Sequence, residues 1–502
     1  MSRRTIIKGA LILTVANIIT RVIGFFYRIY MAKEIGAEGM GLYQLITPLY
    51  MLVWSLSSSG LSTTMSKLTA QEKAKGNIGD VKRLLHIAIC IAVFISTALS
   101  FITYFKSGEI ALNIIKDTRT ELSLRIISLC FPFMAMGSVL RGYYLGLQNT
   151  KISATSQVLE QASRMVIIYL LSSTMIPLGL EYACAAAVWG MTIGELVAFT
   201  YVFIYYLFKR KKYNKASLSI NAAFLMIIAT AIPLTLNKVT SSLFVSVENI
   251  MLPKQLQLFG YTQGEALSIL GRLSGMAMPL IMFPSSLLMA LSTATMPAIS
   301  ENNALNQTIK IKSTIHQSMV ITSIVGAFTA GIFIFFPKEI GILVYSQQQI
   351  SYMLRILGII CPFIYIQVTM SGILNGLGEQ VFIFKINLVS SIITIISIYL
   401  LVPVIGINGY LLPWIFTAIL TTTCTVIRVN KILKINIPLV SLYFKPTLAV
   451  ICSCLVSKLA HDHLWYNIDY KLGVIFTLTC SFLIYLFLIF ELDCINKNDL
   501  KL

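Results

Sequence analysis

The chain carries the stretch RIISLCFPFMAMGSVLRGYYLGLQNT at residues 125–150 and a related stretch, RILGIICPFIYIQVTMSGILNGLGEQ, at residues 355–380. The two align without gaps at an offset of 230 residues, and seven of the 26 pairs are identical. Shared apolar composition alone would give roughly two identical pairs. The same offset relates residues 168–171 to 398–401, and residues 61–63 to 291–293. A register this constant indicates an internal duplication.

The composition of the chain restricts the class of protein. Of the 502 residues, 57% are hydrophobic and only 12% are charged, about half the charged share of a soluble domain. The mean hydropathy is +0.81. These values exclude a soluble enzyme, a disordered chain and a fibrous protein, and they indicate a polytopic membrane protein. The net charge of +19 would suggest nucleic acid in a soluble protein. Here the positive-inside bias accounts for it, and no nucleic-acid partner is expected.

Apolar segments of about 20 residues, long enough to cross a bilayer, recur along the whole chain. We predict fourteen transmembrane helices, at 9–31, 41–66, 84–105, 121–146, 153–175, 182–208, 222–246, 267–296, 316–337, 351–375, 382–403, 409–428, 443–459 and 472–490. Each repeat then spans six helices, and an even number gives both repeats the same orientation. The predicted fold is an all-α polytopic membrane protein with two pseudo-symmetric six-helix lobes around a central cavity, plus two C-terminal helices. The predicted domains are residues 1–220 (N-lobe), 221–440 (C-lobe) and 441–502 (the last two helices and a tail).

The basic residues set the predicted orientation of these helices. With the N-terminus in the cytoplasm, cytoplasmic segments hold 22 Lys and Arg residues and the opposite side holds 8. This asymmetry follows the positive-inside rule. We therefore expect a multi-pass protein of the cell membrane with both termini cytoplasmic.

Two prolines occupy equivalent positions in the duplicated stretches. Pro132 and Pro362 would kink equivalent helices at equivalent depth, and we interpret them as a hinge pair for rocking of the lobes. The alternative is that proline is simply common in transmembrane helices.

The first predicted helix carries a polar stripe. Thr14, Asn17, Arg21, Gly24 and Arg28 recur at spacings of three and four, so they share one helix face. A cation near the middle of a span costs roughly 2.5–3.5 kcal/mol on insertion scales. Two arginines on one stripe therefore suggest an interior cavity that binds an anion, and the planar guanidinium suits phosphate well. The alternatives are that Arg28 snorkels to the interface and that Arg21 pairs with a carboxylate.

Other charged residues also lie within apolar segments. Glu160 and Arg164 are four residues apart and can pair on one helix face, either structurally or as part of a cavity. Arg272 begins a long apolar segment and is the best cationic candidate from the second lobe. Snorkelling of the side chain to the membrane surface is the simpler interpretation for four others, Arg125, Arg141, Arg355 and Lys385.

Motifs of catalysis or cofactor binding are lacking in the sequence. None of the nine cysteines forms a CxxC pair, and no GxxxxGK[ST] or GxGxxG context is present. The sequence His461-Asp462-His463 is a weak metal signal. We therefore assign no catalytic residue, no metal and no cofactor, and we do not expect an enzyme.

Several motifs resemble a known family. Gly24-Phe25-Phe26-Tyr27-Arg28-Ile29, followed by residues 35–45 (IGAEGMGLYQL), resembles the stage V sporulation protein B family, as do residues 141–148 (RGYYLGLQ) and 156–161 (SQVLEQ). This family belongs to the polysaccharide-exporter branch of the multidrug/oligosaccharidyl-lipid/polysaccharide exporter superfamily, beside the MurJ-type lipid II flippases. The resemblance implies a fourteen-helix, two-lobed transporter of a lipid-linked cell-wall precursor, serving spore cortex peptidoglycan in sporulating bacteria.

The resemblance also implies particular site residues. The MurJ-type family has a central arginine in its first helix followed by Gly-Phe, which Arg21 with Gly24-Phe25 matches. A second family arginine falls one residue from Arg28, and an eighth-helix arginine corresponds to Arg272. This sequence departs from the family in its second helix, which has no charge between Glu38 and Lys67. The headgroup contacts are therefore not transferable in full.

The expected function is an alternating-access flippase that exports an undecaprenyl-pyrophosphate-linked precursor, with lipid II as the expected substrate. The substrate-binding candidates are Asn17, Arg21, Arg28, Glu160, Arg164 and Arg272. The expected partners are this lipid-linked oligosaccharide pyrophosphate and membrane lipids, with a coupling cation left open, and the forespore membrane is one expected location. The alternatives are a cation-coupled multidrug antiporter of the same superfamily, or a membrane-embedded glycosyltransferase or acyltransferase.

Overall fold

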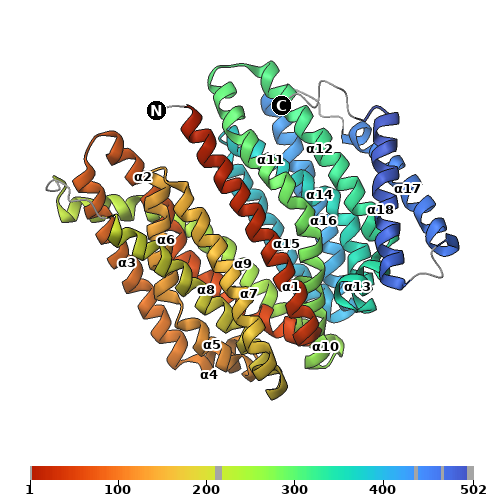
Figure 1. The fold of residues 1–502 in the computed structure, drawn as a ribbon, viewed down its shortest axis with the longest axis horizontal. Helices are drawn as coiled ribbons and strands as arrows, with labels where there is room; N and C mark the ends of the chain where they lie inside the picture. The colour runs from red at the N-terminus through yellow and green to blue at the C-terminus, as the bar shows by residue number, and fades with distance from the viewer. Residues whose placement is uncertain (1–2, 210–216, 435–438, 465–468, 495–502) are drawn as a thin grey trace. The chain divides into compact units, whose positions relative to one another are not determined.

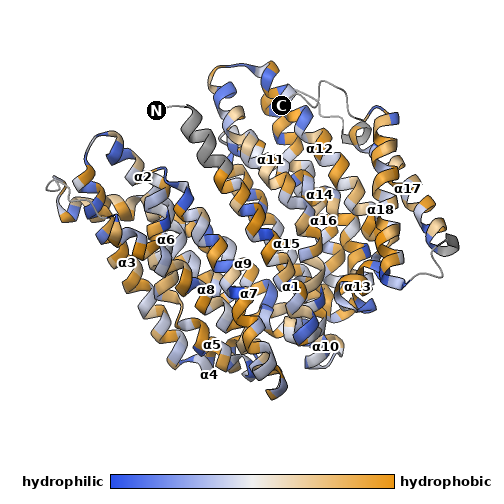
Figure 2. Ribbon diagram, in the orientation of Figure 1, coloured by the Kyte–Doolittle hydropathy of each residue, from blue (hydrophilic) through white to orange (hydrophobic). Residues whose placement is uncertain are grey.

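The computed structural model describes residues 3–209, 217–434, 439–464 and 469–494. Every regular element in these ranges is a helix, and no strand occurs in them. Hydrophobic residues run along the helices, and hydrophilic residues gather at helix ends and in loops (Figure 2). The predicted all-α membrane fold is confirmed (Figure 1). The ends of the chain, which were predicted to be cytoplasmic, include residues 1–2 and 495–502, which lie outside the described residues.

The chain divides into two compact units, Met1–Gly271 and Arg272–Leu502. The longer helices of the first unit are α1 (Arg3–Trp54), α2 (Gly60–Ala74), α3 (Ile78–Phe105), α5 (Glu121–Ser128), α6 (Phe131–Gly146), α7 (Thr150–Met175), α8 (Leu180–Phe208), α9 (Ile220–Phe259) and α10 (Gln263–Leu270). Short elements connect them, namely η1 (Ser55–Ser59), α4 (Ser107–Glu109), η2 (Ile110–Ile115), η3 (Thr118–Thr120) and η4 (Ile176–Leu178).

The second unit begins within the π-helical segment η5 (Gly271–Ala277). Its helices are α11 (Met278–Ala304), α12 (Thr308–Phe335), α13 (Pro337–Tyr345), η6 (Gln348–Ile350), α14 (Ser351–Gly376), α15 (Gln380–Ile405), α16 (Asn408–Leu433), α17 (Leu439–Leu464) and α18 (Tyr470–Glu491). Buried apolar side chains of α11, α12, α14 and α16 form a core cluster within this unit.

Gly36 breaks the long helix α1. Its φ of 69° and ψ of −175° are not helical, and glycine adopts such a conformation without the steric cost that a side chain would add. The break falls between the first two predicted spans, 9–31 and 41–66. Helix α1 therefore consists of two helical segments that meet at Gly36.

In the described part of the chain, eleven helices are long and apolar enough to cross a membrane, or twelve if the segments Thr118–Ser128 and Phe131–Gly146 form one span with a 47° bend. This count treats residues 12–74 as one helix and omits α7, in which polar side chains including Glu160 and Arg164 lower the hydropathy. The number fourteen stays a prediction.

Glycines of the duplicated stretches make the same close contact in each unit. A Cβ atom on Gly142 of α6 would lie 2.2 Å from the carbonyl oxygen of Ser62 in α2. In the second unit, a Cβ atom on Gly372 of α14 would lie 2.7 Å from the carbonyl oxygen of Ser292 in α11. Both members of the second pair follow the first by 230 residues, so the offset found in the sequence is also an offset in helix packing.

The first compact unit extends beyond the boundary expected near residue 220. Helix α9 packs against α1, α2 and α3, and α10 packs against α1. Apolar side chains of α9, including Ala223 and Ile227, are buried in the same core cluster as side chains of α2, α3 and α6. The division into 1–220, 221–440 and 441–502 stays a prediction derived from the repeat.

Candidate functional site

Five polar side chains converge inside the first unit, and we call them the buried charge cluster. Its members are Tyr50 of α1, Arg141 of α6, Glu160 and Arg164 of α7, and Glu195 of α8. The side chain of Glu195 is 5% exposed, and those of Arg141, Glu160 and Arg164 are 13–14% exposed. Four charged groups are thus held inside a membrane protein, where such groups are costly and mark functional sites by default.

Local sequence explains how the cluster assembles. Glu160 and Arg164 are one helical turn apart, so they project from the same face of α7. On α8, Gly194 and Gly190 face that helix, and a Cβ atom on either would lie 2.9 or 3.0 Å from the carbonyl oxygen of Glu160 or Arg164, respectively. Because these glycines have no side chain, α7 and α8 approach closely, which brings Glu195 beside the pair.

The contacts within the cluster differ in length. Nη2 of Arg164 lies 2.9 Å from Oε1 of Glu160, forming the ion pair that the spacing predicts. Tyr50 donates a hydrogen bond of 2.6 Å to Oε1 of Glu195. Arg141 lies between the two carboxylates, 3.9 Å from Oε2 of Glu160 and 4.0 Å from Oε2 of Glu195. Arg141 therefore attracts both glutamates electrostatically without closing a hydrogen bond to either.

Three buried polar atoms of the cluster lack a hydrogen-bond partner among the described residues. They are Nη1 of Arg141, Nε of Arg164 and Oε2 of Glu195. Buried polar groups are nearly always paired, so each exception calls for an explanation such as a ligand. Two arginines and two glutamates also balance in formal charge, which leaves the cluster neutral.

A cavity of about 400 Å³ opens beside the cluster. Arg141, Glu160 and Glu195 line it together with Trp54, Ser62 and Gln157. This volume falls in the range of small-molecule pockets, roughly 300–1,000 Å³, which combine apolar walls with a few convergent polar groups. All of the lining residues belong to the first unit.

The predicted residues of α1 do not line this cavity. Arg21 is half-buried, whereas Asn17 and Arg28 are exposed. A Cβ atom on Gly24 would lie 3.7 Å from Oε1 of Gln161, which places this face of α1 beside α7. The role of Asn17, Arg21 and Arg28 in substrate binding stays a prediction.

The remaining predicted residues lie in different settings. Arg272 is half-buried in η5 and begins the second unit, and its Nε atom is buried with no hydrogen-bond partner in the described part of the chain. Pro132 lies at the start of α6, just after the 47° bend, whereas Pro362 lies inside the continuous helix α14. The two prolines are equivalent in sequence but different in local geometry, and their role as hinges stays a prediction.

The interpretation of Arg141 as a snorkelling residue is wrong. Its side chain is only 13% exposed and faces two carboxylates, because α6 packs against α7 and α8, which carry them. The repeat contained a signal that identifies the cluster. At an offset of 230 residues, Arg141, Glu160 and Arg164 correspond to Ser371, Ser390 and Thr394. Charges that only one copy of a duplication carries are not needed for the shared fold.

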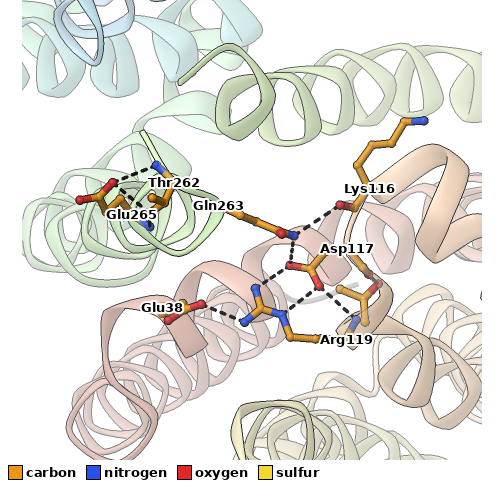
Figure 3. Close-up of polar contacts among 8 residues, drawn as sticks. Glu38, Lys116, Asp117, Arg119, Thr262, Gln263 and Glu265 are labelled. Atoms are coloured by element: carbon orange, nitrogen blue, oxygen red, sulfur yellow. Dashed lines mark hydrogen bonds and ion pairs between the residues drawn. The ribbon is translucent and has the colours of Figure 1, made fainter. Parts of the chain in front are cut away.

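A second polar network joins three segments of the first unit (Figure 3). Arg119 lies 2.8 Å from Asp117 and 2.8 Å from Glu38. Gln263, at the start of α10, donates a hydrogen bond of 2.9 Å to Asp117. The carboxylate of Asp117 is 3% exposed and fully engaged by these partners, so we interpret this network as structural.

No group of three or more His, Cys, Asp or Glu residues in the described ranges is arranged to hold a metal ion. In the weak signal at residues 461–463, the imidazole of His461 contacts the hydroxyl of Thr477 at 2.8 Å. The side chains of Asp462 and His463 lie outside the described residues.

The two helical units and their buried charges define a multi-pass α-helical membrane protein. Comparison with known families places it further. Residues 6–303 match the model of the polysaccharide biosynthesis protein family, and the chain belongs to that family. The MatE family model matches residues 258–400.

Individual relatives agree with this assignment. The chain is 28% identical to Stage V sporulation protein B of Bacillus subtilis (strain 168) over 508 residues, covering 100% of this chain and 98% of that protein. It is 25% identical to Lipid II flippase MurJ of the same organism over 350 residues, covering 64% and 63% of the two chains. The resemblance noted in the sequence is confirmed.

Solved structures share the fold. A structure of Lipid II flippase MurJ in an inward closed conformation matches with a TM-score of 0.73 at 18% identity, covering 97% of this chain and 100% of that one. An inward-facing multidrug resistance MATE family transporter of the MOP superfamily matches with a TM-score of 0.63 at 12% identity, covering 85% and 99%.

Proposed function

We propose that this protein is a flippase that exports a lipid-linked cell-wall precursor by alternating access of its two units. The observation that carries the proposal is the similarity along the whole chain to Stage V sporulation protein B, joined by the similarity to Lipid II flippase MurJ. The relatives in these comparisons are transporters or of unassigned activity, and the proposal includes no catalytic step.

The arginines give the proposal a physical basis. A pyrophosphate-linked lipid carries its negative charge beside the membrane, and a guanidinium recognises phosphate through two parallel hydrogen bonds. Arg21 and Arg272 are half-buried in apolar helices, one in each unit. In this proposal each is a substrate-binding residue of its own unit, and Arg28 and Asn17 lie on the same face of α1 as Arg21.

The finer proposal concerns substrate and location. The lipid is undecaprenyl pyrophosphate, the cargo is lipid II, and the product serves spore cortex peptidoglycan. Lipid II in the name of one relative and sporulation in the name of another support this choice. The protein lies in the cytoplasmic membrane, with the forespore membrane as one location, and both termini are cytoplasmic, as the 22-to-8 distribution of cations supports.

A flipping assay on proteoliposomes that contain the purified full chain tests this proposal. Fluorescent lipid II is placed in both leaflets, and a membrane-impermeant reagent quenches the outer population. Complete quenching with the protein, against half quenching in empty liposomes, supports the proposal. If the protein moves no lipid II and no other undecaprenyl-pyrophosphate saccharide, the proposal is wrong.

A cation-coupled antiporter is the second candidate, and one observation favours it. Glu195 is buried and Glu160 is mostly buried, at 14% exposure, and acids inside a membrane protein bind protons or metal cations in transporters. The distinguishing measurement is uptake of a cationic dye into proteoliposomes driven by an imposed proton or sodium gradient. Gradient-driven dye transport without lipid flipping would select this candidate.

A further inference from the structure

The walls of the cavity beside the buried charge cluster combine apolar side chains, such as Met51 and Leu145, with uncharged hydrogen-bonding groups. Trp54 and Tyr50 contribute aromatic rings, Ser62 and Ser138 contribute hydroxyls, and Gln157 contributes an amide. Hydroxyls and amides both donate and accept hydrogen bonds. A ligand that itself both donates and accepts, and that also has an apolar face to pack on aromatic rings, suits these walls.

The charge balance of the cluster argues against an ion as the ligand. Arg141 is the one cation on the cavity wall, and Glu160 and Glu195 are the two acids there. Arg164 does not line the cavity, but its Nη2 lies 2.9 Å from Oε1 of Glu160 and balances the charge of that carboxylate. A phosphate or pyrophosphate would therefore meet carboxylate oxygens, and an ammonium group would meet Arg141. The charges around this cavity balance, whereas Arg21 of α1 is proposed to bind the anionic pyrophosphate.

The gap between Arg141 and Glu195 defines the chemistry of the missing group. Nη2 of Arg141 lies 4.0 Å from Oε2 of Glu195, and Nη1 lies 3.9 Å from Oε2 of Glu160. Nη1 of Arg141 and Oε2 of Glu195 lack hydrogen-bond partners within the described ranges. The group that satisfies both must accept from the guanidinium and donate to the carboxylate. A hydroxyl does both, whereas a fully ionised pyrophosphate diester offers no donor and an ammonium offers no acceptor.

From these observations we propose that the cavity of the first unit binds a neutral sugar ring of the transported lipid-linked saccharide. One ring hydroxyl lies between Arg141 and Glu195, and the apolar face of the ring packs on Trp54. This inference rests on the proposed flippase function, and it separates the recognition of sugar, in this cavity, from the recognition of pyrophosphate by arginines elsewhere. Ser371 and Ser390, which replace Arg141 and Glu160 in the second repeat, limit the site to the first unit.

The test is calorimetric titration of the purified full chain in lipid nanodiscs with N-acetylglucosamine, a neutral sugar. Glu195→Gln keeps the shape of the side chain but turns the free acceptor into a donor. Gln157→Leu removes a polar wall group without changing any charge. We expect saturable binding to the wild type and about a tenfold loss of affinity in each variant, because a hydrogen bond to a buried partner is lost.

A matched control lies in the second unit. Arg428 and Glu379 also form an arginine–glutamate pair, at 2.8 Å, and neither lines the cavity. Glu379→Gln should bind N-acetylglucosamine as the wild type does. Inorganic pyrophosphate and ethylammonium should not displace the sugar.

Several results would overturn the inference. One is no saturable binding of N-acetylglucosamine to the wild type, which would leave only ordered water between Arg141 and Glu195. Another is unchanged affinity in both Glu195→Gln and Gln157→Leu. Displacement by pyrophosphate would instead identify an anion site. Since binding is measured without transport, a protein that flips lipid II but binds no sugar refutes this inference alone. One that binds sugar in the cavity but flips no lipid refutes the proposed function.

Discussion

Gly146 of α6 packs directly against Ser66 of α2: a Cβ atom on this glycine would lie 2.6 Å from the serine carbonyl oxygen. In the second unit, Gly376 has the same relation to Met296, at 2.8 Å. Backbone atoms cannot move aside as a flexible side chain can. Close helix contacts through glycine are common in membrane proteins, where they allow neighbouring backbones to approach.

We therefore expect Gly146→Ala to destabilise the protein by about 1–3 kcal/mol through overpacking. Gly137→Ala on the same helix is the matched control, because its Cβ atom would meet Phe199 at an ordinary 3.5 Å. Thermal unfolding in detergent measures both variants. Equal unfolding temperatures for the two would contradict the contact described.

Arg21 is expected to act through its charge and its two-pronged geometry. Arg21→Ala should reduce lipid flipping at least about tenfold, and Arg21→Lys should restore only part of it, because lysine keeps the charge but loses the bidentate hydrogen bonds. Arg355→Ala, which removes an exposed arginine, should flip lipid as the wild type does. Flipping and membrane abundance are measured together for each variant.

Two results would remove Arg21 from the substrate site. One is normal flipping by Arg21→Ala. The other is loss of function that only follows loss of the protein from the membrane, which is the behaviour of a structural ion pair. Loss of flipping in Arg355→Ala at normal abundance would show that a binding residue had been taken for an anchor.

Removing one member of the Glu160–Arg164 pair should destabilise the protein, because the other charge is then left without its partner in a mostly buried position. Arg164→Met leaves a carboxylate without its nearest cation and should cost about 3 kcal/mol, whereas the double variant Glu160→Gln/Arg164→Met should recover much of that loss. The exposed pair Lys106–Glu109 is the control, because its charged atoms lie 2.7 Å apart, close to the 2.9 Å of Glu160 and Arg164. Glu109→Gln should change the free energy of unfolding by less than about 1 kcal/mol. Unfolding in denaturant measures all three. If Arg164→Met loses no more stability than Glu109→Gln, the carboxylate of Glu160 does not need Arg164 as its partner.

The predicted orientation can be tested with single cysteines in a background from which the nine native cysteines have been removed. Lys75 and Lys106 are suitable positions because their side chains are 61% and 58% exposed. A membrane-impermeant thiol reagent should label Lys106→Cys in intact cells and should label Lys75→Cys only after lysis. The reverse pattern would invert the topology.

The sequence predicted the class of fold well because hydropathy reports directly on burial in lipid. The helical character, the membrane spans and the 230-residue offset all derive from local composition and from identities such as Gly142 with Gly372. Hydropathy does not report which neighbour a helix packs against. The repeat places α9, the seventh predicted span, in the second lobe, and its packing against α2 and α3 is visible only in the structure.

The same limit explains the partial prediction of the site. Spacing alone related Glu160 to Arg164, because both lie on one helix. The positions of Arg141 and Glu195 depend on how α6, α7 and α8 pack, and therefore on glycines such as Gly194 whose contacts no linear pattern reveals. Arg141 lies near the end of its predicted span, and its partners Glu160 and Glu195 lie on other helices. Sequence spacing therefore favours snorkelling for it.

The hydrogen bond from Gln263 to Asp117 joins two segments that the ribosome makes at different times. A ribosome that has reached residue 220 has yet to synthesise α9 and α10, both of which pack against α1. Gly41 also meets the carbonyl oxygen of Leu267, where a Cβ atom would lie at 2.0 Å. The first unit therefore completes its packing only after α10 has been translated, so its early helices must wait in the membrane without their final neighbours during elongation.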